Sequence, residues 1–149
     1  MNKLIFLFAT LFSLNCFCQE DKLNFVEAEF NVEVDDSVYE IKLGNSYYTK
    51  TQSSAMQFNL MPKAYEEIKA KMMKSQKEGF KKEVEINGIK LLLMKTNQTN
   101  ENGNFIIAIY CKKINDDSTL VINSFYKVDE ELIMKPIIEK AAISAKLKE

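Results

Sequence analysis

The sequence contains no histidine and no arginine, so all 20 of its basic residues are lysine. Histidine is the side chain most used for general acid–base catalysis and for metal ligation at neutral pH. Arginine supplies the planar group that clamps phosphate and carboxylate in two-point contacts. Because both are missing, we expect a protein that is not an enzyme and that holds no metal and no cofactor.

Glycine and clustered charge are also scarce. Four glycines, Gly44, Gly79, Gly88 and Gly103, are too dispersed for a glycine-rich phosphate loop. The net charge is −1 with both signs interspersed, which gives no basic surface for nucleic acid. The paired acids stand at predicted turns or helix starts, where carboxylates serve capping and solubility. An enzyme that uses carboxylates or lysines alone is the catalytic alternative.

The N-terminus has the pattern of a signal peptide. Lys3 precedes an apolar run, residues 4–14, that is too short to cross a bilayer as a helix. Cys16 and Cys18 occupy the −3 and −1 positions before Gln19, where signal peptidase prefers small residues. We therefore predict a signal peptide over residues 1–18 and a single domain over residues 19–149, exported to the periplasm or beyond and without a transmembrane span. The alternative is a lipoprotein anchored through Cys16 or Cys18.

Removal of residues 1–18 would leave one cysteine, Cys111. An exported chain without an internal disulfide depends on its hydrophobic core for stability. The hydrophobic content of 46% is sufficient for such a core. Cys111 lies in an apolar run, and no histidine exists to act as its base, so we expect a buried, unreactive thiol.

The first half of the mature chain predicts strands followed by a helix. Residues 26–34 alternate apolar and polar side chains, which predicts a strand with one buried and one solvated face. Turn residues separate further predicted strands at residues 38–43, 47–51 and 56–60. Pro62 is expected to open a helix whose apolar stripe reaches Phe80, with Gly79 ending it.

Residues 80–126 predict an antiparallel meander of four strands. The pair Asn87-Gly88 is typical of a two-residue type I′ turn between the first two. Residues 96–104 are polar and are expected to form a long loop, the best candidate for a contact surface. Residues 105–111 are apolar on both faces, which predicts an interior strand covered on both sides.

The last predicted element is a helix over residues 129–147, with Asp129 as its N-cap. Pro136 conflicts with an uninterrupted helix, because proline lacks the backbone donor and clashes with the preceding turn. Either a short first turn precedes Pro136 or the regular helix begins there, and we favour the second.

The order of these elements resembles the PsbP-like superfamily, which includes the DcrB-like bacterial envelope proteins. The matching features are Gly79-Phe80, the run over residues 84–90 (VEINGIK) that leads into the meander, and a closing helix that ends with residues 142–147 (AISAKL). The resemblance covers about residues 59–147, with a looser fit from residue 38. Pro136 and the few aromatic residues between Tyr47 and Met56 depart from the pattern.

The resemblance implies an α+β fold: an α/β/α sandwich whose central, mainly antiparallel sheet has one helix on each face. Members are mostly non-enzymatic accessory or adaptor proteins, and they offer no shared catalytic motif to match. The expected function is therefore that of an exported, non-catalytic protein that binds another protein or a membrane complex. The alternatives are a small-ligand-binding protein, with a pocket between the sheet and the helix over residues 65–80, and an immunity or chaperone partner of a secreted toxin.

Overall fold

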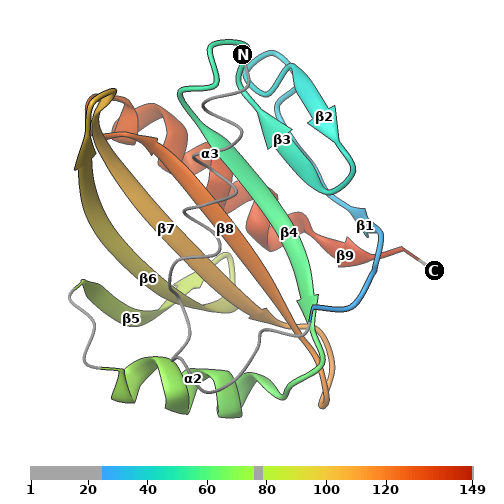
Figure 1. Cartoon of the computed structure of the whole chain (residues 1–149). Coiled ribbons are helices and arrows are strands. Elements are labelled where there is room, and N and C mark those ends of the chain that lie inside the picture. The colour runs from blue at the N-terminus through green and yellow to red at the C-terminus, as the bar shows by residue number, and fades with distance from the viewer. Residues whose placement is uncertain (1–24, 76–78, 149) are drawn as a thin grey trace.

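The computed structural model describes residues 25–75 and 79–148, so the predicted signal peptide, with Cys16 and Cys18, lies outside the described residues. Strand pairing builds a seven-stranded antiparallel sheet in the order β2-β3-β4-β8-β7-β6-β5 (Figure 1). The strands predicted at residues 38–43, 47–51 and 56–60 correspond to the first three, with shifted bounds. The bounds are β2 (Ile41–Leu43), β3 (Ser46–Tyr48), β4 (Ala55–Met61), β5 (Phe80–Ile86), β6 (Ile89–Asn100), β7 (Gly103–Lys113) and β8 (Thr119–Lys127).

The predicted meander is confirmed. Strands β5 to β8 follow one another along the chain and pair antiparallel in that order. Asn87 and Gly88 have φ angles of 51° and 76°, the left-handed values that a type I′ turn requires at both central positions. This turn sets the register in which Ile86 pairs with Ile89.

One helix packs on each face of the sheet, which confirms the predicted fold class. These helices are α2 (Tyr65–Lys74) and α3 (Glu131–Ser144), and Figure 1 shows α3 behind the sheet and α2 across its lower end. Leu91 and Leu93 of β6 belong to the apolar cluster under α3, whereas Leu92 and Met94 belong to the cluster under α2. Neither helix is long and apolar enough to cross a membrane.

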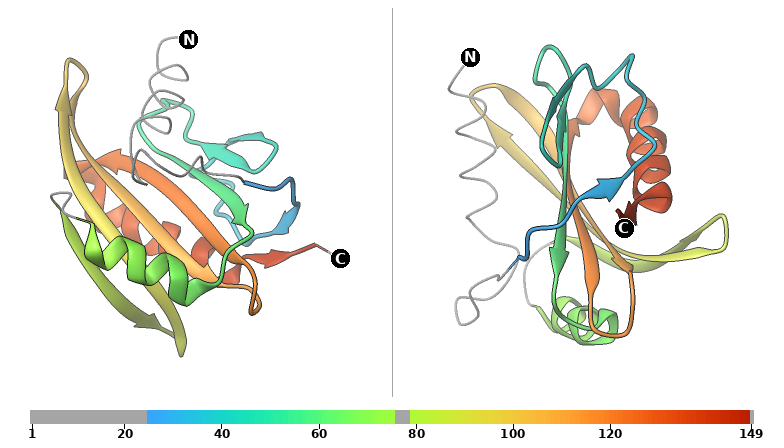
Figure 2. Two further views of the ribbon diagram at one scale, coloured as in Figure 1. Left: turned by 60° about the horizontal axis from the view of Figure 1, so that its bottom comes forward. Right: turned by 90° about the vertical axis from the view of Figure 1, so that its right-hand side faces the viewer.

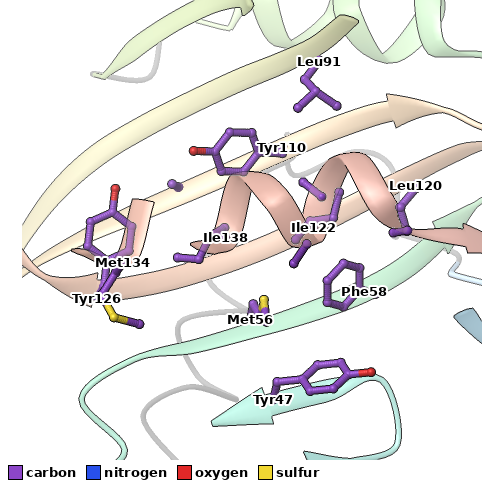
Figure 3. Close-up of a cluster of buried hydrophobic side chains, with 14 of the residues drawn as sticks. Tyr47, Met56, Phe58, Leu91, Tyr110, Leu120, Ile122, Tyr126, Met134 and Ile138 are labelled. Carbon is purple, nitrogen blue, oxygen red and sulfur yellow. The ribbon is translucent and has the colours of Figure 1, made fainter. Parts of the chain in front are cut away.

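The interior position of residues 105–111 is confirmed, because β7 lies between β6 and β8 and has buried residues on both faces. Cys111 is fully buried, as expected, and its Sγ lies 3.7 Å from Sδ of Met72 on α2. On the opposite face, Figure 3 shows Tyr110 and Ile122 of the sheet gathered around Ile138 of α3.

A lysine side chain closes the C-terminal end of α3. Nζ of Lys112, on β7, donates hydrogen bonds to the carbonyl oxygens of Ile143 at 2.6 Å and Ala145 at 2.8 Å. Carbonyls at a helix C-terminus lack partners within the helix, and a cation there also complements the helix dipole. Burial, with the charge of Lys146 as a second cause, lowers the pKa of Lys112 below its usual range.

The predicted first helix is too long at both ends. α2 begins at Tyr65, after Pro62, and ends at Lys74, so the apolar stripe does not reach Phe80. Phe80 instead begins β5. Gly79 is required for a different reason: a Cβ there would lie 2.7 Å from Cγ2 of Thr96 and 2.8 Å from the carbonyl oxygen of Lys95. The spacing matched a helix, but strand pairing determines the conformation.

Residues 96–104 do not form a long loop, and that prediction is wrong. β6 continues to Asn100, β7 begins at Gly103, and these two residues are paired across a tight hairpin. The hairpin projects at one end of the sheet (Figure 2, left). Its polar residues lack the apolar alternation that marks a half-buried strand, so the sequence pattern does not reveal it.

The preferred start of the last helix at Pro136 is also wrong. A 3-10 turn, η1 (Val128–Glu130), leads into α3 at Glu131, and Pro136 lies inside the helix. Asp129 lies in η1, and Glu130 occupies the N-cap position without a side-chain cap bond. Proline at this position forfeits the hydrogen bond to the carbonyl of Leu132, a residue that is 92% exposed, so water can satisfy that side of the first turn.

The N-terminal segment keeps most of its predicted alternation of burial, but little of it is a regular strand. Burial alternates from Ala28 to Val34 as expected, whereas Val26 is 43% exposed. The regular strand is only β1 (Phe30–Asn31), and it pairs with β9 (Lys146–Leu147), outside the seven-stranded sheet. β9 also shortens the predicted last helix, which ends at Ser144.

Candidate functional site

The face of the sheet that carries α2 has polar side chains between two apolar clusters, one beneath α2 and one formed by Ala55, Phe105 and Phe125. Beneath α2 the strands contribute apolar residues such as Val121 and Met61. Towards β3 the same face carries uncharged polar side chains: Ser46 is paired with Gln57, and Gln57 with Asn123. Asn59, two residues along β4, completes this set, because alternate residues of a strand share a face. We name Ser46, Gln57, Asn59 and Asn123 the polar row.

A cleft of about 610 Å³ opens beside Asn59 of the polar row. One wall is the extended segment over residues 25–29, and the other walls come from the β2–β3 turn and from β4. We name it the Asn59 cleft. Its lining residues are Phe25, Val26, Glu27, Ala28, Glu29, Gly44, Asn45, Phe58 and Asn59.

Hydrogen bonds hold the cleft walls together. The Val26 backbone N–H donates to the carbonyl of Leu60 at 3.0 Å, which places residues 25–29 alongside β4. Asn45 joins the other two walls, because its Nδ2 donates to the carbonyl of Ala28 at 2.6 Å and its own carbonyl accepts from the Phe58 N–H at 3.0 Å. The cleft is therefore a preformed feature of the fold.

Aromatic packing fixes one side of the cleft, while other apolar side chains remain open to solvent. The ring of Phe58 lies 6.4 Å from that of Phe30 and 5.8 Å from that of Tyr47, centroid to centroid. By contrast, Phe25 is 36% exposed and Val26 is 43% exposed. Two partly exposed apolar side chains in one cleft are a feature of binding sites rather than of a closed core.

Asn59 carries the most unusual feature of the cleft. Its Nδ2 is buried and, within the described residues, has no hydrogen-bond partner. Folded proteins satisfy nearly all such groups, because a buried donor without an acceptor costs about 1–3 kcal/mol. The donor is therefore available for an acceptor that the described residues do not supply.

The rim of the cleft is acidic. Glu27 and Glu29 line it, and the Glu29 carboxylate accepts a hydrogen bond from Nζ of Lys148 at 2.7 Å. The hydrogen bond and the charge of Lys148 lower the pKa of Glu29 below its usual range. No lysine occurs between residue 25 and Lys42, whereas the same stretch holds Glu27, Glu29, Glu33, Asp35, Asp36 and Glu40. The residues that line the cleft therefore carry a negative net charge.

A second, smaller cleft of about 340 Å³ lies between the β3–β4 loop and the start of η1. Its polar groups are largely paired, since Oγ of Ser53 donates to the Glu130 carboxylate at 3.4 Å. It has neither the unpartnered buried donor nor the exposed aliphatic side chain of the Asn59 cleft. Its lining residues are Thr51, Gln52, Ser53, Asn102, Phe105, Lys127 and Glu130.

The pocket expected between the sheet and the first helix is filled by side chains. Tyr65, Ile68 and Met72 of α2 are all buried against the sheet. At the edge of this interface, Tyr65 Oη and Lys69 Nζ donate to Oε2 of Glu83 on β5, at 3.1 and 2.7 Å.

The sequence names no catalytic, cofactor-binding or metal-binding residue, and it did not single out Asn59. Alternation places Gln57 and Asn59 opposite Met56 and Phe58, on a face that the pattern marks as solvated. Residues 25–29, which line the same cleft as Asn59, are far from it in sequence. Among the described residues, no group of three or more cysteine or acidic side chains could hold a metal ion.

Comparison with solved structures finds a likeness of fold. No protein-family model matches the chain, and no curated protein matches its sequence. The fold is similar to the solution structure of cyanobacterial PsbP (CyanoP) from Synechocystis sp. PCC 6803, with a TM-score of 0.48 and 7% sequence identity. The alignment covers 91% of this chain and 99% of that chain. One fold serves many functions, so this likeness assigns none.

Proposed function

We propose that this chain is an exported, non-catalytic protein that binds another protein, free or within a membrane complex, through the Asn59 cleft. The observation that carries the proposal is the buried, unpartnered Nδ2 of Asn59 beside the exposed side chains of Phe25 and Val26. Such a site gains both hydrogen bonding and apolar burial when a partner occupies it. Export rests on the predicted signal peptide over residues 1–18.

The lining of the cleft favours binding over catalysis. Its titratable groups are Glu27 and Glu29, and Glu29 is held by Lys148. A nucleophile paired with a base, or an acid–base pair in a desolvated pocket, would be the sign of chemistry. Cys111, the thiol of the mature chain, lies beneath α2 rather than in the cleft.

We also propose that this chain is a member of the PsbP-like superfamily. It rests on the resemblance over residues 59–147, in which the Gly79-Phe80 pair, the Asn87-Gly88 turn and the closing helix occur in the family's order. The adaptor role common in that superfamily agrees with a site built for binding. Membership of the superfamily is thus a hypothesis about evolutionary origin. The proposed function rests on the Asn59 cleft.

A small-molecule ligand is the second candidate for the same cleft. Its volume of about 610 Å³ lies in the range of ligand pockets, roughly 300–1,000 Å³. An apolar body with one hydrogen-bond acceptor would fit its lining. In a thermal-shift screen of small molecules, a hit that loses its effect in Asn59→Leu would favour this candidate.

Site-specific photocrosslinking tests the protein-binding proposal. The exported protein is produced with p-benzoylphenylalanine in place of Phe25 and, as a matched control, in place of Phe80, which is 50% exposed and lies at the far edge of the sheet. We expect an adduct of one defined mass from position 25 only, and excess wild-type protein should compete it away while Asn59→Leu should not. No adduct at position 25, or the same adduct from both positions, would contradict the proposal.

A further inference from the structure

We infer that the Asn59 cleft takes an extended peptide segment that combines a free backbone carbonyl, an apolar side chain and a lysine or arginine. This inference rests on the proposed function, because it names the part of the partner that enters the cleft. Each of the three requirements corresponds to a separate feature of the lining, and the extended conformation corresponds to a fourth.

The backbone carbonyl follows from Asn59. Its buried Nδ2 requires an acceptor, and the cleft lining includes no lysine that would hold a charged one. A carboxylate or phosphate would also face Glu27 and Glu29 at the rim, where like charges repel. A neutral carbonyl oxygen satisfies the donor without that penalty, and every peptide unit supplies one.

The apolar side chain follows from Phe25 and Val26. Their exposed surfaces, at 36% and 43%, face solvent in the free protein. Burial of apolar surface is favourable by about 25 cal/mol per Å². The ligand therefore gains affinity by covering these two side chains with an apolar group of its own.

The extended conformation follows from the shape of the site. The wall of residues 25–29 runs antiparallel to β4, joined to it through the Val26–Leu60 bridge. Outside the cleft lining, the polar row continues from Asn59 to Gln57 and Asn123, whose amide groups offer donors and acceptors like those of a peptide backbone. An extended segment presents its backbone groups and its side chains in the alternation that such a site matches.

The basic residue follows from the charge of the rim. In the described part of the chain, Glu27 has no ion-pair partner, and the stretch from residue 25 to Ile41 carries acidic residues and no lysine. Charges of this kind select partners and speed association more than they add affinity. A lysine or arginine that flanks the apolar side chain would lie against Glu27.

Fluorescence anisotropy with three labelled peptides tests the inference on the exported protein. The peptides alternate valine with lysine, with serine or with glutamate. We expect the valine–lysine peptide to bind about tenfold or more tightly than the valine–glutamate peptide, with the serine peptide between them. Asn59→Leu should weaken the valine–lysine and valine–serine peptides about tenfold, the equivalent of one hydrogen bond.

Matched variants separate the site from general electrostatics. Glu27→Gln should weaken the valine–lysine peptide only, whereas Glu40→Gln, an exposed acid of the same stretch outside the cleft, should change nothing. Asn97→Leu, on the exposed part of the β6–β7 hairpin, should also bind as the wild type does.

Two outcomes would overturn the inference: equal binding of the three peptides, or binding that Asn59→Leu leaves unchanged. If the Phe25 crosslink forms while either outcome is found, a protein binds at the cleft but does not present this kind of segment, and the proposed function survives alone. If the crosslink fails as well, both are wrong.

Discussion

The two faces of the sheet differ in how completely they are used for stability. On the α3 side, an apolar cluster extends from Tyr47 at one side of the sheet to Leu91 at the other, and Figure 3 shows α3 seated in it. On the α2 side, the short helix covers one apolar cluster, a second cluster of Ala55, Phe105 and Phe125 lies further along the strands, and the polar row lies between them. Figure 2 (right) shows the two helices at different heights on the sheet.

This difference indicates that the α3 face mainly stabilises the fold, whereas part of the α2 face is kept for binding. Apolar residues on the α2 face of β4 and β8, in place of Gln57, Asn59 and Asn123, would join the two apolar clusters of that face. The chain instead keeps amide groups there, one of them a buried donor without a partner. Sites that sacrifice stability in this way are commonly sites of function.

The largest expected effect compares the core under α3 with the polar row. Ile138 is fully buried in the α3 cluster, so Ile138→Ala should reduce the free energy of unfolding by about 2–5 kcal/mol. Gln57→Ala, in the polar row, should change it by no more than about 0.5 kcal/mol. Urea denaturation of both variants measures this, and equal losses would mean that the two regions contribute alike.

The next effect concerns the entry of the chain into β5 after α2. Gly79→Ala should cost about 2–3 kcal/mol, because the new Cβ would meet backbone of Lys95 at a φ of +136° that alanine avoids. Gly103→Ala has a similar φ of +123° but open space around it, and should cost about 1 kcal/mol. Thermal unfolding distinguishes them; the same loss in both variants would show that φ alone matters.

The attachment of α3 depends on Lys112. Lys112→Met removes the hydrogen bonds to the last carbonyls of the helix and should cost about 1.5–3 kcal/mol, the value for bonds to a charged group. Lys113→Met, next in sequence but exposed and paired with Asp116, should cost clearly less than Lys112→Met, because exposed ion pairs contribute little to stability. Chemical denaturation that ranks Lys113 above Lys112 would refute the capping role.

Asn59 should respond in the opposite direction. Asn59→Leu removes a buried donor without a partner and should raise the free energy of unfolding by about 1 kcal/mol. Asn97→Leu, at an exposed position, should leave it within about 0.5 kcal/mol of wild type. A loss of stability in Asn59→Leu, measured in urea, would mean that the amide already has a partner in the free protein.

The smallest effect concerns the attachment of α2 and depends on pH. The hydrogen bond from Lys69, followed by that from Tyr65, lowers the pKa of Glu83 below its ordinary value. A carboxyl whose pKa is lower in the folded state stabilises the protein above about pH 4.3, and this stabilisation is lost as the pH falls through the folded-state pKa.

Glu83→Gln should therefore lose less stability than wild type between neutral pH and acid, whereas Glu85→Gln, exposed on the same strand, should follow the wild-type curve. Unfolding midpoints measured across that range test this point. A Glu83→Gln curve that parallels the wild type would contradict it.

The fold was predictable where local signals and burial agree. The Asn87-Gly88 turn and the two apolar faces of residues 105–111 each specify both a conformation and a place in the sheet. The two wrong predictions share a physical cause, because strand pairing determines the conformation in both. Residues 79–80 fit a helical stripe, yet Phe80 pairs with β6. Residues 96–100 show no apolar alternation, yet they pair with β7. Pro136 likewise remains inside a helix because the turn before it is open to solvent.

Sequence patterns could not predict the Asn59 cleft. Its walls come from residues 25–29, the β2–β3 turn and β4, which meet only in the folded chain. Alternation shows that Asn59 differs from its neighbours, but it does not show that residues 25–29 cover that side of β4. The burial that makes its amide unusual is a tertiary property.

In the proposed function, Nδ2 of Asn59 gains its hydrogen-bond acceptor only when a partner binds. The most direct test is the side-chain amide signal of Asn59 in a ¹⁵N–¹H correlation spectrum, followed during titration with the valine–lysine peptide and assigned by its loss in Asn59→Leu. We expect a downfield shift of the Nδ2 protons on binding, while the side-chain amide signal of Asn97 does not shift. An Asn59 signal that does not move while the peptide binds would contradict it.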